Sequence, residues 1–121
     1  MGVIQRFKGR VAFDAPFVGR THVNVTARAG GGQANATQLL YDGANVSTVA
    51  TAADSVKLPT AKPGAEYNLV NEHATNAIQV FGGGTDTINK VASATGVSQA
   101  AGVAAYYFCV YAGNWSRVQS S

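Results

Sequence analysis

The apolar stretches of this chain are short, and their shortness constrains the fold more than any other feature. β-branched and aromatic residues recur in brief runs interrupted by glycine, proline, asparagine and aspartate, while the period of a helix is hard to find. At 121 residues the chain is long enough for one domain and too short for two ordinary ones. The pattern predicts an all-β fold, namely a single β-sandwich or jelly-roll domain with an extended N-terminal arm.

Three consecutive glycines, Gly30 to Gly32, mark the clearest joint in the sequence. Glycine gives the backbone its greatest freedom and brings no side chain to pack. We therefore divide the chain into a basic N-terminal arm with the first strands, residues 1–29, and a β-sandwich or jelly-roll core, residues 30–121. In the arm a single acid, Asp14, accompanies five basic residues: Arg6, Lys8, Arg10, Arg20 and Arg28.

Turn signals predict three hairpins beyond this joint. The pair Asp42-Gly43 tolerates the positive φ angles of a two-residue turn. The polar stretch Glu72 to Asn76 separates two apolar runs, and Gly113-Asn114 separates the last two. Each of these places is expected to join two antiparallel neighbours.

Within the strands we expect four core positions, which are Leu69, Phe81, Tyr107 and Val110. Tyr67 and Leu69 should share one face, because side chains two residues apart on a strand point to the same side. The run VAAYYFCVY carries bulky residues at both parities, a pattern typical of a strand that is buried on both faces.

The residues that could support catalysis or metal binding are few and far apart. Cys109 lies in an apolar run that favours a raised pKa and an inert thiol, and His22 and His73 do not supply spaced zinc ligands. The acids mostly sit beside turn residues, and an enzyme would need a pair such as Asp54 and Glu66 within about 10 Å across a cleft. The sequence therefore predicts no enzyme, no metal site and no cofactor.

Aromatic residues near the end of the chain allow two interpretations. Tyr106, Tyr111 and Trp115 could form a platform on which a sugar stacks, or they could pack in a core or a subunit interface, which we favour. No apolar stretch approaches the roughly 20 residues of a membrane helix, and no apolar signal core opens the chain. Basic residues are not clustered densely with aromatics, so we expect protein contact, with no direct contact to nucleic acid or membrane.

The segment from Asp54 to Trp115 resembles a recurring module of structural proteins in tailed bacteriophages. The parts that carry the resemblance are Asp54-Ser55-Val56-Lys57-Leu58-Pro59, Val70-Asn71, Ile78-Gln79-Val80-Phe81, Asp86-Thr87-Ile88-Asn89 and Gly113-Asn114-Trp115. The chain holds little besides this module, which makes it most similar to capsid decoration, or cement, proteins. These are small β-rich proteins that bind over joints between major capsid protein subunits and brace the expanded shell.

The resemblance implies a virion structural protein on the capsid exterior, made in the host cytoplasm. Its expected partners are the major capsid protein and further copies of itself, as a dimer or trimer. Expected capsid contacts come from the arm: Arg6, Lys8, Arg10, Phe13, Phe17 and Arg20. Tyr106, Tyr111 and Trp115 are expected to serve self-assembly or to form a surface aromatic group. The alternative is a receptor-binding or carbohydrate-binding module of a tail or fibre, and the enzyme comes third.

Overall fold

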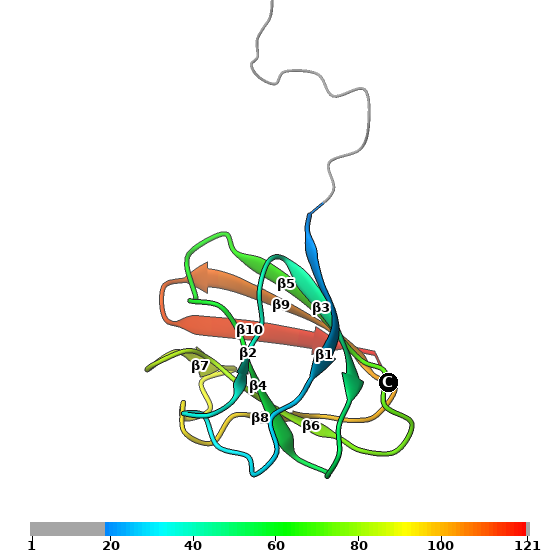
Figure 1. The fold of residues 1–121 in the computed structure, drawn as a ribbon. Helices are drawn as coiled ribbons and strands as arrows, with labels where there is room; N and C mark the ends of the chain where they lie inside the picture. Colours follow the sequence, from blue (N-terminus) through cyan, green and yellow to red (C-terminus); the bar gives the residue numbers. More distant parts are fainter. Residues whose placement is uncertain (1–18, 121) are drawn as a thin grey trace, which may run out of the picture.

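The computed structural model describes residues 19–120, and all regular structure in that part of the chain is β-strand (Figure 1). The expected all-β fold is confirmed. The strands are β1 Thr21–Thr26, β2 Thr37–Gln38, β3 Gly43–Thr48, β4 Asp54–Lys57, β5 Glu66–Asn71, β6 Ile78–Phe81, β7 Thr87–Ile88, β8 Val97–Gln99, β9 Ala104–Tyr111 and β10 Asn114–Gln119. Between residues 19 and 120 there is no helix that could span a membrane.

The chain alternates between two sheets as it advances. One sheet has six strands in the order β1-β3-β5-β9-β10-β7, and the other has four in the order β2-β4-β6-β8. Neighbours β1, β3 and β5 run parallel in the first sheet, as do β2, β4 and β6 in the second. The arrangement is solenoid-like and is not a clear sandwich or jelly roll, because jelly rolls are antiparallel while these ladders stack successive turns of chain in one direction.

This connectivity explains why two of the three predicted hairpins are wrong. Asp42-Gly43 leads into β3, whose neighbours β1 and β5 are both parallel to it. The stretch Glu72 to Asn76 carries the chain from β5 in one sheet to β6 in the other. Parallel neighbours need a crossover, and the turn residues serve as its corners. The hairpin at Gly113-Asn114 is confirmed, because β9 and β10 pair antiparallel around it.

The core lies between the two sheets and draws side chains from both. Leu69, Phe81 and Tyr107 are buried, as expected, and Tyr67 is buried on the same side of β5 as Leu69. Val110 is 70% exposed, so its assignment to the core is wrong. Along β9 the burial alternates, and the expected burial of this strand on both faces is also wrong. Within residues 19–120, the face of β9 that points away from the core is more exposed than the face that contacts it.

We expect Phe81→Ala to lower the free energy of unfolding by about 3–5 kcal/mol, because the side chain is buried in a tight site. A methyl group placed on Gly96 would lie 2.8 Å from Phe81 Cδ1, which leaves little room for the core to close over the cavity. The matched control Val110→Ala should cost less than about 0.5 kcal/mol. Urea unfolding of both variants measures the two costs, and similar values would contradict the assigned strand faces.

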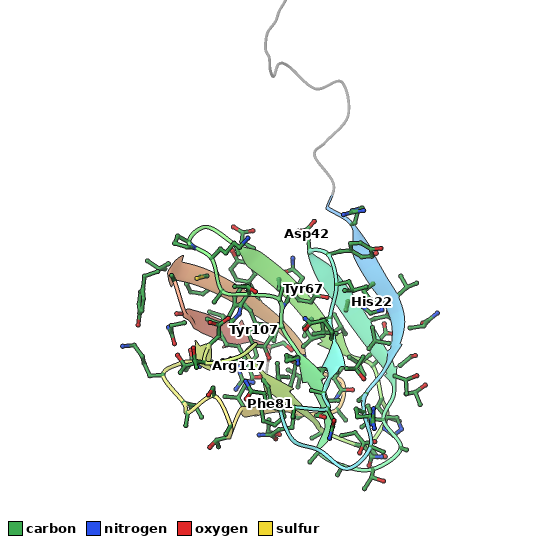
Figure 2. The ribbon with its side chains drawn as sticks, turned by 60° about the vertical axis from the view of Figure 1, so that its left-hand side comes forward. His22, Asp42, Tyr67, Phe81, Tyr107 and Arg117 are labelled. Atoms are coloured by element: carbon green, nitrogen blue, oxygen red, sulfur yellow. The ribbon has the colours of Figure 1, made fainter. Side chains whose placement is uncertain are left out.

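A buried polar cluster joins the two sheets. Gln99 of β8 donates through Nε2 to the carbonyl oxygens of Leu69 and Val103, at 2.9 Å each, and its Oε1 accepts a 2.8 Å hydrogen bond from the Tyr107 hydroxyl. Burial raises the pKa of Tyr107 to about 12, although nearby Arg117 opposes the shift. Figure 2 shows Tyr107 and Arg117 close together on the adjacent strands β9 and β10. Because every polar group of Gln99 is paired, the cluster is compatible with full burial.

The residues assigned to the arm divide into two parts. Residues 1–18 lie outside the described part of the chain. Residues from 21 onward are paired with the core, since β1 is hydrogen-bonded to β3 and Arg28 forms a backbone bridge with Ser55. Gly30, Gly31 and Gly32 all have positive φ angles, which glycine adopts without strain, and they lie in the connection between β1 and β2.

Candidate functional site

The main candidate is the side of the six-stranded sheet that faces away from the core, which we call the outer face. Alternation along the strands places apolar side chains on it, because every second residue of β9 and its neighbours points outward. Its apolar members are Val23, Val70, Tyr106, Phe108, Val110 and Val118. An apolar sheet face that residues 19–120 leave uncovered is typical of a contact surface.

Cross-strand pairing arranges these side chains in rows. Tyr106 lies between Val118 of β10 and Asn68 of β5 in the ladder, and Phe108 lies between Ser116 and Glu66. The rings of Tyr106 and Phe108 stack, with centroids 5.4 Å apart and planes inclined by 23°. The rings occupy the middle of the sheet, so a partner that approached the outer face would meet them first.

The outer face is hollowed in two places. The first hollow, about 380 Å³, lies over β1, β3 and β5, where Val23 of β1 and Val70 of β5 lie on either side of β3. A side chain at Gly43 would come within 3.0 Å of the Asn68 carbonyl oxygen, so glycine keeps this hollow open. The second hollow, about 370 Å³, lies over β5, β9 and β10 and is lined by Tyr106 and Val118. Val70 lines both hollows and makes the surface continuous.

A third hollow of about 550 Å³ lies at one end of the sheet and is more polar. Asp42 and Glu66 line it together with Tyr41 and part of Trp115. In Figure 2, Asp42 lies at the same end of the body as the start of β1, and the Arg20 N–H donates to its Oδ2 at 3.2 Å. Asp54 is not among its lining residues: this carboxylate is buried in β4 and accepts the Thr51 N–H at 3.0 Å. The three hollows therefore do not bring Asp54 and Glu66 together.

The structure describes only one of the expected capsid-contact residues. Arg20 is exposed, and its guanidinium carbon lies 4.3 Å from the centroid of the Tyr41 ring. The others lie outside the described residues: Arg6, Lys8, Arg10, Phe13 and Phe17. Arg20 thus carries its charge to the margin of the first hollow, and the Tyr41 ring that it contacts lines the third.

The three expected assembly aromatics do not form one group. Tyr106 is 37% exposed on the outer face, and Tyr111 is 48% exposed near Lys90, whose Nζ lies 5.4 Å from its ring centroid. Trp115 is only 1% exposed, and its Nε1 donates to the Pro59 carbonyl oxygen at 3.2 Å. Trp115 is a core residue, so the idea that it forms a surface platform with the two tyrosines is corrected.

The remaining reactive side chains have structural partners. Cys109 is buried, and its thiol donates to the Tyr111 carbonyl oxygen at 3.0 Å. His22 Nδ1 accepts the Leu40 N–H, and His73 Nδ1 accepts the N–H groups of Thr75 and Asn76. Within residues 19–120, no three or more His, Cys, Asp or Glu side chains form a group that could hold a metal ion.

The outer face was missed in the sequence because its residues in β9 are as apolar as the residues of β9 that face the core. In β9 the inward Tyr107 and the outward Tyr106 are the same residue type, so hydrophobicity does not separate the two faces. The neighbouring β5 carried the missing signal: Glu66 and Asn68 alternate with Tyr67 and Leu69, which marks one side of the sheet as exposed.

No protein-family model, curated protein or solved structure matches the chain.

Proposed function

We propose that this protein is a structural component of a bacteriophage virion that binds the outer surface of the capsid and stabilises contacts between major capsid protein subunits. The observation that carries the proposal is the outer face, a broad apolar surface with stacked aromatic rings and few charges. The module-like segment from Asp54 to Trp115 supplies the phage setting through its resemblance. The role needs a rigid binding surface and no cofactor, and the proposal includes no catalysis.

The two surfaces of the protein would divide the contacts. Basic and aromatic residues of the N-terminal segment, with Arg20 at its base, would contact the major capsid protein. The outer face, with Tyr106 at its centre, would contact further copies of the protein in a dimer or trimer. Two sheets around one core support this proposal, because they give the outer face a rigid base.

Binding of this kind stabilises a shell by linkage. A protein that binds the assembled, expanded shell and not its separated subunits shifts the equilibrium toward the intact shell. Repetition around the shell lets modest contacts act together, because one anchored copy raises the effective concentration of its neighbours' contacts. A small decoration protein therefore needs no single tight site to contribute.

Co-sedimentation with expanded, decoration-free capsids tests the proposal. We expect saturable binding at a fixed number of copies per shell, and bound shells should withstand a higher temperature than bare ones. A triple Arg6→Ser, Lys8→Ser, Arg10→Ser variant should bind more weakly. The matched control removes the same number of charges elsewhere, at Lys57, Lys62 and Lys90. No binding by the unaltered protein, or equal weakening in both variants, would contradict the proposed capsid contact.

The alternative, a carbohydrate-binding module of a tail or fibre, is favoured by Tyr111. Its ring is half exposed beside Lys90, so one face could stack on a sugar. Trp115→Ala does not test this idea, because the substitution removes a core residue. Glycan binding that is lost in Tyr111→Ala but kept in Tyr106→Ala would move the assignment to this alternative.

A further inference from the structure

Strand β1 is the longest edge strand that residues 19–120 contain. The two sheets have four edge strands, which are β1 and β7 in one sheet and β2 and β8 in the other. β7 and β2 have two residues each and β8 has three, whereas β1 has six. A very short edge gives another chain little to pair with, so β1 is the edge at which a further strand can be added.

Alternate residues of β1 direct their backbone groups away from β3. The Arg20 carbonyl oxygen accepts a 3.0 Å hydrogen bond from the residue before β3, and the Asn24 N–H donates to Asn45 Oδ1 at 2.8 Å. Arg20 and Asn24 therefore face the sheet. Successive residues of a strand present their backbone groups to opposite edges. Thr21 and Val23 thus present two donors and two acceptors on the side of β1 that no other strand of residues 19–120 covers.

The features that usually prevent an edge from pairing are scarce in β1. The strand contains neither a charged residue nor a proline, and both are common on edges that stay single. It does contain a bulge, because Asn24 has a φ of 56° and the pairing with β3 changes register between His22 and Val25. The bulge disturbs the second half of the strand and leaves the edge regular at Thr21 and Val23.

Exposed apolar side chains flank this edge on both faces of the sheet. Val23 is 64% exposed on the outer face, and His22 points to the opposite face. Leu40 and Tyr41 lie beside His22: the Leu40 N–H donates to His22 Nδ1, and the Tyr41 ring lies edge to face with the imidazole at 6.4 Å. Both are 44% exposed. Figure 2 shows His22 on the strand that forms the margin of the sheet, so a partner there buries apolar surface as well as backbone groups.

We propose that β1 pairs antiparallel with β1 of a second copy of this chain, across a two-fold axis perpendicular to the sheet. Self-pairing suits this edge, because Thr21 and Val23 offer equal numbers of donors and acceptors to the same groups of the other copy. β1 carries no charge, so the two paired strands meet without repulsion. The apolar flanks also meet their equivalents, with Val23 on one face and Leu40 and Tyr41 on the other. A two-fold contact closes after two copies, which makes the assembly a dimer.

The dimer joins two six-stranded sheets edge to edge. The direction of the axis keeps both outer faces on one side, and the two first hollows meet at the seam, because Thr21 and Val23 line them. The contact goes beyond the proposed function, because it forms without a capsid. It is also separate from the outer-face contact at Tyr106, since β3 and β5 lie between β1 and β9.

Sedimentation equilibrium of the full chain, without capsid, tests the pairing. The unaltered protein should form a dimer with a Kd of about 1–100 µM, because a short edge buries less than a standard interface. Val23→Lys places one positive charge per copy at the seam and should raise the Kd at least about tenfold. Val118→Lys is the matched control, since Val118 is 61% exposed on the same face at β10, and it should leave the Kd unchanged.

Two results of this measurement would overturn the proposal. Equal weakening by the two lysines would move the contact to the middle of the outer face. An unaltered protein that stays monomeric up to about 1 mM would exclude self-pairing and assign the edge to a strand of a different chain. Because the test contains no capsid, capsid binding is measured separately by co-sedimentation, and the two proposals fail independently.

Cysteine cross-linking locates the contact by a second route. In the register that pairs the whole regular edge, Thr21 lies at the two-fold axis, where directly opposed Cα atoms are about 5.5 Å apart and within reach of a disulfide. Thr21→Cys should therefore give a disulfide-linked dimer under mild oxidation, and the natural thiol at Cys109 is buried. Val118→Cys is the control and should give much less dimer. Equal yields from the two variants would overturn pairing at β1.

Discussion

Trp115→Ala should lower the free energy of unfolding by about 3–5 kcal/mol, which for a domain of this size is a large part of its stability. Trp115 is the largest of the fully buried side chains and joins β10 to the loop at Pro59 through its indole N–H. Its removal leaves a cavity and an unpaired carbonyl oxygen. Because the protein has one tryptophan, unfolding of the variant is followed by circular dichroism in urea.

Two further variants make this result interpretable. Trp115→Phe keeps much of the apolar volume and loses the hydrogen bond, so it should cost clearly less than the alanine variant. Val118→Ala on the same strand removes an exposed side chain and should stay within about 0.5 kcal/mol of the unaltered protein. A Trp115→Ala cost as small as that of Val118→Ala would contradict the core position. It would also reopen the surface platform with Tyr106 and Tyr111.

The second large effect is expected at Gln99. Gln99→Leu keeps a similar volume but removes the acceptor of the Tyr107 hydroxyl and one donor from each of the carbonyl oxygens of Leu69 and Val103; the Val103 oxygen keeps its 3.0 Å hydrogen bond from the Asn71 N–H. An unpaired buried hydroxyl costs about 1–3 kcal/mol and each further lost hydrogen bond about 0.5–1.5 kcal/mol, so the substitution should lower the free energy of unfolding by about 2–5 kcal/mol. Thermal and urea unfolding of the same variant should agree on this loss.

Tyr107→Phe is the natural companion, because it removes only the hydroxyl and should cost about 0.5–1.5 kcal/mol. In the double variant the Tyr107 hydroxyl is no longer there to be left unpaired. Its cost should therefore be smaller than the sum of the two single costs. Strict additivity would show that Gln99 and Tyr107 do not interact, and a negligible effect of Gln99→Leu would contradict the cluster as the link between the two sheets.

The sequence predicted the strands well and their connections poorly. Alternation at Tyr67 and Leu69, and the hairpin at Gly113-Asn114, depend on neighbours close in the chain, and both predictions were correct. The corner at Asp42-Gly43 has the same local signal as a hairpin. The difference between a hairpin and a corner is decided by the two strands that pair with β3. These are β1, which precedes it, and β5, which follows it, and neither is joined to β3 by this turn.

The site residues show the same contrast between features set by neighbours in the chain, which could be predicted, and features set by distant partners, which could not. Burial of Cys109 could be read from its apolar neighbours, whereas the burial of Trp115 depends on Pro59, which approaches it from the other end of the module. Gln99 carried no signal of burial at all, because an amide is usually exposed. Its burial depends on partners that are distant in sequence or in the other sheet, because its amide donates to the carbonyl oxygens of Leu69 and Val103 and accepts from the Tyr107 hydroxyl.

The parallel stacking of successive turns has a consequence for how this protein could change in length. Each of the strands β1, β3 and β5 is hydrogen-bonded only to its immediate neighbours in the ladder, and β2, β4 and β6 repeat that relation in the second sheet. Such a body grows by whole turns, because a new turn needs to match only the one beside it. An added turn at the β1 end would widen the outer face, while β9 and β8, which pair antiparallel with β5 and β6, end the two parallel ladders on the opposite side.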